Sequence, residues 1–270
     1  MNLLLPWIRI FLAVFAYIVI ALLASAIIRK IGQNLKEMKG RTSPRVLFVG
    51  AIANLCVLGT TLLLLLFLDK RPISSLGILL SNKDLAFAAI GSVTILILAA
   101  AYVGLLKQSG RFQVNPNKPF KKFSETINFF GGVIVLLIVA LQEEVLYRGY
   151  ITLNLLSFGP LVVIVTSTII FTAIHLLTNR GSFYQILSWL VGGAIFSYVY
   201  LITGSIWVPV ILHFATDLTN TLVFNIAGQF SLFEISPPIT ARPLASFRVA
   251  TAVILVGVLL ALFGTAIRLA

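Results

Sequence analysis

Long apolar blocks constrain the fold of this chain more than any other feature of its sequence. Their apolar residues follow neither a two-residue nor a 3.6-residue period, and blocks of 18 or more such residues are typical of membrane-spanning helices. Eight spans are predicted: Trp7–Ile28, Arg45–Leu68, Asp84–Leu106, Thr126–Leu146 or beyond, Pro160–Thr178, Phe183–Thr203, Ser205–Ala227 and Phe247–Arg268. The short connections leave no room for a soluble domain. The sequence therefore predicts an all-α polytopic membrane protein with a single membrane domain over residues 1–270.

The composition agrees with this class of protein. The chain is 59% hydrophobic and only 10% charged, whereas soluble domains carry about 25% charged residues. The first block is about twice as long as the apolar core of a signal peptide, so we interpret it as an uncleaved helix. The single cysteine, Cys56, excludes an internal disulfide bond. We expect an integral, multi-pass protein, in the plasma or inner membrane if the organism is bacterial.

The formal net charge is +12, and the basic residues gather in the connections, above all at 29–45 and 107–122. Aromatic residues do not alternate with them as they do on a stacking surface for nucleic acid. The expected partner is therefore the lipid bilayer and not nucleic acid. With the N-terminus outside, the cytoplasmic connections hold 14 basic residues and the opposite side holds six. The positive-inside bias favours this orientation.

Five of the ten Asp, Glu and His residues lie inside predicted spans, where ionisable groups are costly and usually functional. They are Glu143, Glu144, His175, His213 and Asp217. Glu144 and Arg148 are four residues apart, as are His213 and Asp217, so each pair shares a helix face. A carboxylate one turn from an imidazole can fix the tautomer of the ring, as in catalytic and metal sites.

Structural explanations stay open for each of these features taken alone. Glu144 and Arg148 can form an ion pair that only neutralises itself. Asp217 and His213 can clamp two helices together, and an intramembrane histidine is often a hydrogen-bonded packing residue. Taken together, however, these explanations must account for both histidines and every buried acid. This favours a polar functional site in the core of the bundle.

The positions of these residues along their spans predict the length of the fourth helix. If that helix ended at Leu146, Glu143 and His175 would lie at opposite faces of the membrane. We therefore predict a long, tilted helix from about Phe129 to Ser157. It would have nearly 30 residues and measure about 40 Å at 1.5 Å per residue, with "GP" (159–160) as the turn.

Three segments, in this order, resemble the motifs of a known family. The segments "EEVLYR" (143–148), "FTAIH" (171–175) and "HFATD" (213–217) are similar to its E-E-x-x-x-R, F-x-x-x-H and H-x-x-x-(N or D) motifs. The family is that of the CPBP intramembrane proteases, also called Abi, which includes the CAAX prenyl endopeptidases. The resemblance covers about residues 126–225, which we expect to form the catalytic region.

The resemblance implies a role for each motif residue. Glu143 would activate water, assisted by His175, and Glu144 with Arg148 would hold the first motif in place. His213 and the residue four positions after it would stabilise the oxyanion or help to bind the scissile carbonyl. These roles agree with the needs of peptide hydrolysis, which are a base near water and a hydrogen-bond donor near the developing negative charge.

The last motif position departs from that of the prenyl endopeptidases, which have Asn where this chain has Asp217. An amide can donate a hydrogen bond to an oxyanion, whereas an ionised carboxylate cannot. We therefore expect Asp217 to orient His213 and His213 to keep the donor role.

Zinc is conceivable as a cofactor through His175, His213 and Glu143, with an open fourth position for water. These residues lie on three different helices, and no HExxH motif is present to pre-form a chelate. Rhomboid-type G-x-S-G and presenilin-type G-x-G-D motifs are absent as well. We therefore favour metal-free hydrolysis and no cofactor.

The favoured function is that of an intramembrane endopeptidase. Its substrate would be a prenylated CAAX-type protein, a leader peptide or another membrane-associated protein, and the sequence does not choose among them. The alternative is a non-proteolytic polytopic protein, either an immunity or scaffold protein or a proton-coupled transporter that uses the same buried ionisable groups.

Overall fold

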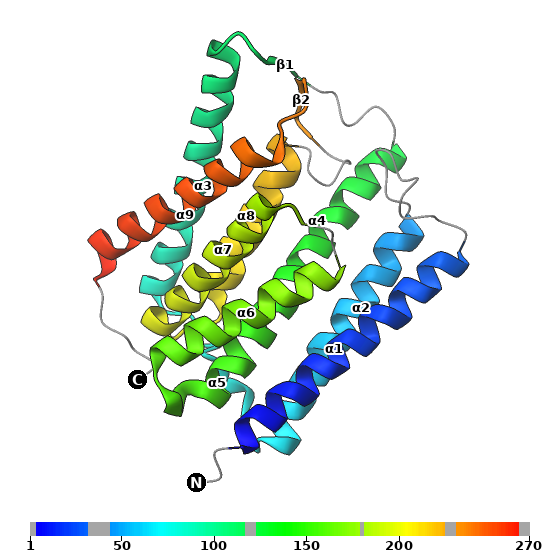
Figure 1. Ribbon diagram of the computed structural model, residues 1–270, viewed down its shortest axis with the longest axis vertical. Helices are drawn as coiled ribbons and strands as arrows, with labels where there is room; N and C mark the ends of the chain where they lie inside the picture. Colours follow the sequence, from blue (N-terminus) through cyan, green and yellow to red (C-terminus); the bar gives the residue numbers. More distant parts are fainter. Residues whose placement is uncertain (1–3, 32–43, 117–122, 179–180, 225–230, 265–270) are drawn as a thin grey trace.

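The computed structural model describes residues 4–31, 44–116, 123–178, 181–224 and 231–264, and long helices make up most of this part of the chain (Figure 1). The long helices are α1 (Leu5–Lys30), α2 (Pro44–Leu63), α3 (Asn82–Gln108), α4 (Phe123–Glu144), α6 (Pro160–Thr178), α7 (Phe183–Thr203), α8 (Trp207–Phe224) and α9 (Ala241–Phe263). They correspond to the eight predicted spans, although α9 begins earlier than expected. The predicted ends at Ala227 and Arg268 lie outside the described residues. The all-α polytopic fold is confirmed.

Length and composition separate one of these helices from the others. Among the described residues, seven helical stretches are long and apolar enough to cross a membrane, and α8 is not among them. That helix has 18 residues and carries both His213 and Asp217. Its His213, Thr219 and Thr221 side chains are buried in the bundle.

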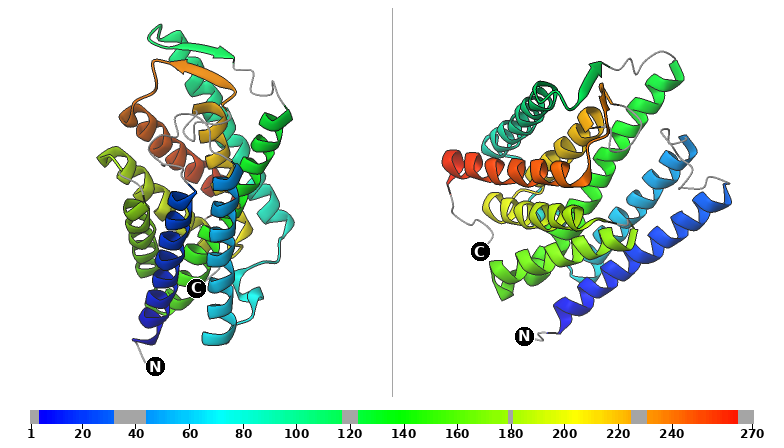
Figure 2. Two further views of the ribbon diagram at one scale, coloured as in Figure 1. Left: turned by 90° about the vertical axis from the view of Figure 1, so that its right-hand side faces the viewer. Right: turned by 45° about the horizontal axis from the view of Figure 1, so that its top comes forward.

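Successive long helices run in opposite directions, so the connections alternate between the two ends of the bundle (Figures 1 and 2). At one end, the short strands β1 (Gln113–Pro116) and β2 (Phe233–Ser236) pair in antiparallel register, after α3 and before α9. The described basic residues Arg29, Lys30, Lys107, Arg111 and Arg242 lie at or near the helix ends on this side. We call this side the basic end.

We call the helix that carries the first motif the motif helix, and it is longer than α4 alone. It continues through a π-helical segment, η3 (Val145–Ile151), then α5 (Thr152–Leu155) and a 3₁₀ turn, η4 (Leu156–Phe158). The apolar stretch from Glu125 to Phe158 covers 34 residues, so the predicted long helix is confirmed. Gly159, with φ of 92°, makes the turn into α6 because glycine tolerates a positive φ. The π-helical segment was not predicted, and such segments occur frequently at functional sites.

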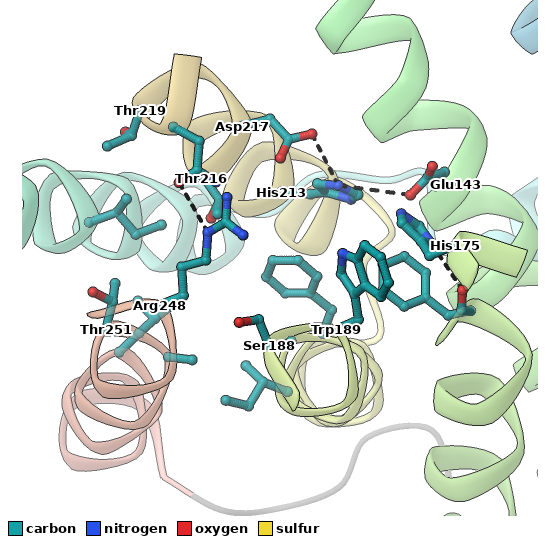
Figure 3. Close-up of a pocket in the computed structure, with 18 of the residues that line it drawn as sticks. Glu143, His175, Ser188, Trp189, His213, Thr216, Asp217, Thr219, Arg248 and Thr251 are labelled. Carbon is teal, nitrogen blue, oxygen red and sulfur yellow. Dashed lines mark hydrogen bonds and ion pairs between the residues drawn. The ribbon is translucent and has the colours of Figure 1, made fainter. Parts of the chain in front are cut away.

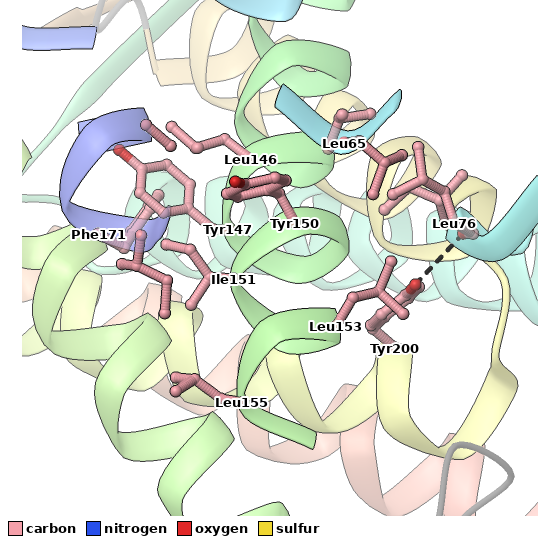
Figure 4. Close-up of a cluster of buried hydrophobic side chains, with 14 of the residues drawn as sticks. Leu65, Leu76, Leu146, Tyr147, Tyr150, Ile151, Leu153, Leu155, Phe171 and Tyr200 are labelled. Atoms are coloured by element: carbon pink, nitrogen blue, oxygen red, sulfur yellow. Dashed lines mark hydrogen bonds between the residues drawn. The ribbon is translucent and has the colours of Figure 1, made fainter. Parts of the chain in front are cut away.

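The π-helical segment forms the centre of the larger apolar core (Figure 4). Leu146, Tyr147, Tyr150 and Ile151 are fully buried there, among side chains of α1, α2, α6 and α7. Gly149 allows a close approach from the connection between α2 and α3, because an added Cβ would lie 2.6 Å from the Leu76 Cδ2 atom. In lipid, packing of this kind holds helices together without any gain from exclusion of water.

Two serine hydroxyls tie α6 and α7 to this segment. The Ser197 oxygen on α7 lies 3.3 Å from the Ser167 oxygen on α6 and 2.9 Å from the Gly193 carbonyl oxygen of its own helix, and Ser167 donates to the Tyr147 carbonyl oxygen at 3.0 Å. Both serines are fully buried. Hydrogen bonds between membrane helices have few competitors in the hydrocarbon interior. They therefore fix the lateral position of the motif helix relative to α6 and α7.

The charge asymmetry of the two ends predicts the orientation in the membrane. A reporter that is active only in the cytoplasm should give a signal when it is fused after Lys39 or after Lys118, because both basic connections then lie inside. Both positions lie outside the described residues. The same reporter fused after Ser74, at the opposite end, is the control and should give none. Silence at both basic-end positions would refute this orientation.

Candidate active site

The three motifs converge on one place in the bundle. Glu143 and Glu144 end α4, Arg148 lies in η3, and His213 and Asp217 lie on α8. Contacts of 3.9 Å or less connect these five side chains. The sixth predicted residue, His175 on α6, lines the same cavity as Glu143, His213 and Asp217 (Figure 3). The structure thus brings all six sequence-predicted residues together.

Glu144 and Arg148 form a fully buried ion pair. The Arg148 NH1 group donates to Glu144 Oε1 at 3.0 Å, as the four-residue spacing predicted, and both side chains are 0% exposed. The Arg148 NH2 group donates to the Gly193 carbonyl oxygen on α7 at 3.3 Å. Its guanidinium carbon lies 4.9 Å from the ring centroid of Phe171 and 5.5 Å from that of Phe196. The aromatic faces favour the buried cation by cation–π attraction.

His213 lies between carboxylates on both sides of its ring. Its Nδ1 atom is 2.6 Å from Glu144 Oε1, and its Nε2 atom is 3.4 Å from Asp217 Oδ2 and 3.9 Å from Glu143 Oε2. The ring stacks on Phe196 with centroids 5.4 Å apart. Sequence spacing identified Asp217 as the partner, but the shorter contact is with Glu144, which is 69 residues away in the chain. We infer that Glu144 holds the ring and that Asp217 faces its other nitrogen.

His175 has a different environment. Its Nδ1 atom lies 3.0 Å from the Phe171 carbonyl oxygen, which can only accept, so this nitrogen carries the proton. In that tautomer the Nε2 atom is an acceptor. The ring lies between those of Phe171 and Trp189, at centroid distances of 4.2 and 5.1 Å. Figure 3 shows it beside the Glu143 carboxylate.

A cavity of about 270 Å³ connects these groups with α9. It extends from Glu143 and His213 toward the basic end, past Gln185 near the start of α7 and Asn220 near the end of α8, to Arg248 on α9. Sequence analysis missed Arg248 as a site residue and counted it among the connection charges. Its position just inside a predicted span was the signal that could have identified it.

The described residues do not fit the proposed zinc site. Among them, no group of three or more His, Cys, Asp or Glu side chains has an arrangement that could hold a metal ion. The ring nitrogens of His213 face Glu144 on one side and Asp217 with Glu143 on the other. Metal-free hydrolysis stays a prediction.

The helices and the buried ionisable cluster define an integral, multi-pass membrane protein with a polar site in its core. Residues 125–219 match the family model of the type II CAAX prenyl endopeptidase Rce1-like proteins. The resemblance to a family of CAAX-type intramembrane proteases, which the three motifs carry, is thus confirmed over these residues. No curated protein and no solved structure matches the chain.

The geometry predicts that the two adjacent glutamates differ in their effect on stability. Glu144→Gln should destabilise the protein by about 3–5 kcal/mol, because it leaves Arg148 buried without a counter-charge. Glu143→Gln should change stability little or increase it, because it relieves repulsion among neighbouring carboxylates. Thermal unfolding in detergent, followed by tryptophan fluorescence, measures both. Equal losses in the two variants would contradict this division.

Proposed function

We propose that this chain is an intramembrane endopeptidase that hydrolyses a peptide bond with a water molecule activated by Glu143 and His175. The substrate would be a prenylated CAAX-type protein, a leader peptide or another membrane-associated protein. The observation that carries the proposal is the convergence of Glu143, His175 and His213 from three helices on one cavity. The match of residues 125–219 to a family of intramembrane proteases supports the reaction class.

Glu143 is the general base in this proposal. Glu143 lines the cavity, so a water molecule there can contact its carboxylate, and its Oε2 atom has no hydrogen-bond partner among the described residues. His175, with its proton on Nδ1, offers Nε2 as a second acceptor for the same water. Two acceptors orient the water so that one of its lone pairs points at the scissile carbonyl carbon.

His213 is the electrophilic group. The contact of its Nδ1 with Glu144 orients the ring. In this proposal the ring carries a proton on each nitrogen, stabilised by the surrounding carboxylates, and Nε2 donates to the oxygen of the scissile carbonyl. A pre-oriented donor in a low-dielectric site stabilises the oxyanion without reorganisation. Glu144 is itself neutralised by Arg148, so it acts as a positioning residue and not as a second base.

The proton balance follows from these positions. Glu143 takes a proton from water as the water oxygen bonds to the carbonyl carbon, and the carbonyl oxygen becomes an oxyanion that His213 stabilises. As the oxyanion collapses and the carbon–nitrogen bond breaks, Glu143 delivers its proton to the leaving amine nitrogen. The products are a carboxylic acid and an amine, and Glu143 returns to its ionised form.

The orientation of the bundle determines the side from which substrate arrives. The cavity extends toward the basic end, and the charge asymmetry predicts that this end is cytoplasmic. In this proposal, substrate enters from the cytoplasmic side even though the N-terminus lies outside. The resemblance to the prenyl endopeptidases implies a site open to the cytosol and cytosolic termini. The first agrees with the loop-charge prediction, and the second does not.

Activity measurements test the class of protein. Purified protein in detergent should cleave members of a peptide library, and Glu143→Ala should lower the rate by about 10²–10⁴-fold, the usual contribution of a general base. Phe130→Ala, on an exposed side chain of the same helix, is the matched control and should retain activity. A proton-coupled transporter would show no cleavage with the unaltered protein or with either variant. That result would overturn the proposal in favour of the alternative class.

Metal dependence is a separate prediction. Because the described residues do not form a metal-binding group, a chelator should leave cleavage unchanged and the active protein should contain no stoichiometric zinc. Elemental analysis of the purified protein measures this. Zinc that disappears in His175→Ala and His213→Ala, with activity restored by zinc after chelation, would reverse the assignment.

A further inference from the structure

Arg248 is a charged group of the cavity that the proposed mechanism does not use. It lies in the second turn of α9, outside the region matched by the family model. It nevertheless lines the same cavity as Glu143 and His213. In Figure 3, Arg248 extends from α9 toward α8, with Asp217 and His213 between it and Glu143.

The guanidinium of Arg248 makes few polar contacts with the rest of the protein. Its Nε atom lies 3.4 Å from the Asn220 side-chain oxygen, and this is its only hydrogen bond to the described residues. It forms no salt bridge with them either: the charge of Asp217 attracts it, but the Asp217 carboxylate contacts His213 at 3.4 Å. A guanidinium inside a span is costly unless an anion or hydrogen-bond acceptors satisfy it. Its terminal amino groups are therefore available to an anionic ligand in the cavity.

Two hydroxyl groups at the same end of the cavity lack partners as well. The Oγ1 atoms of Thr219 on α8 and Thr251 on α9 are buried and have no hydrogen-bond partner. Both residues line the cavity, and Figure 3 shows them at the end of the cavity where Arg248 lies. A guanidinium fork together with hydroxyl donors is suited to a carboxylate, which accepts two parallel hydrogen bonds from arginine. These groups form an anion-binding end opposite the catalytic end.

The spacing between the two ends defines the length of the ligand. Asn220, the partner of Arg248, lies seven residues after His213 on the same helix, or about 10 Å along its axis. An extended peptide covers this distance in about three residues. A substrate whose scissile carbonyl contacts His213 would therefore place the third residue beyond the cleaved bond near Arg248.

We propose that Arg248 binds the free C-terminal carboxylate of the substrate, about three residues beyond the scissile bond. Arg248 is then a specificity-determining residue that selects peptides cleaved near their C-terminus. This inference rests on the proposed endopeptidase function and specifies which of the open substrate classes the site accepts.

Paired substrates test the inference. A farnesylated peptide ending in Cys-Val-Ile-Ser, and each library peptide that is cleaved, are prepared as the free acid and as the C-terminal amide. The unaltered protein should cleave the acid with a kcat/KM about 10- to 100-fold higher than the amide, as expected for a charge-assisted hydrogen bond. Arg248→Gln should reduce cleavage of the acid to the level of the amide, mainly through KM, because the contact is remote from the reacting atoms.

Two further variants separate binding from folding. Arg248→Lys keeps the charge but not the planar fork, so it should retain part of the preference for the acid. Arg242→Gln, on an exposed side chain one and a half turns earlier on α9, should leave both rates unchanged. An unaltered protein that cleaves acid and amide equally would overturn the carboxylate assignment alone. Equal losses on both substrates in Arg248→Gln would assign Arg248 a structural role, and no cleavage of any peptide would overturn the proposed function itself.

Discussion

One carboxylate oxygen holds the site together. Glu144 Oε1 accepts a hydrogen bond from Arg148 at 3.0 Å and contacts the Nδ1 atom of His213 at 2.6 Å. Arg148 in turn bonds to the Gly193 carbonyl oxygen, so the network connects the motif helix with α7 and α8. Charges in an apolar interior are tolerated only when their partners are in place. The position of the His213 ring therefore depends on an ion pair that itself takes no part in the proposed chemistry.

The adjacent glutamates illustrate how helix geometry divides two identical side chains between two roles. Successive residues of a helix point about 100° apart, as follows from 3.6 residues per turn. Glu144 consequently faces the bundle interior and is 0% exposed, whereas Glu143 lines the cavity with Oε2 unbonded to the described residues. The first is bound to a cation and a histidine, while the second keeps its capacity to accept a proton. In the proposed mechanism, this difference is the reason that Glu143 and not Glu144 acts as the base.

Sequence reasoning succeeded where the answer depended on local spacing or on depth in the membrane. The Glu144–Arg148 pair follows from its four-residue separation, and the long motif helix follows from the need to bring Glu143 to the depth of His175. The contact between Glu144 and His213 could not be predicted, because it joins residues 69 positions apart and depends on how α4 and α8 pack. The π-helical segment also escaped, since no residue type in "VLYRGYI" distinguishes that geometry from an α-helix.

The part of the chain outside the family match fixes the far half of the motif helix. Asp69, whose side chain is 0% exposed, pairs with Arg9 of α1 at 3.0 Å and accepts a hydrogen bond from Asn154 of α5 at 2.8 Å. Arg71 donates to the Leu153 carbonyl oxygen at 2.6 Å. This helix begins at the basic end and carries Glu143 near its middle. A small tilt of its far end would therefore displace the Glu143 carboxylate relative to α8. The contacts with Arg9, Asp69 and Arg71 restrain that tilt. We infer that α1 and the connection between α2 and α3 preserve the distances between Glu143, Glu144 and His213 without contributing any reactive group.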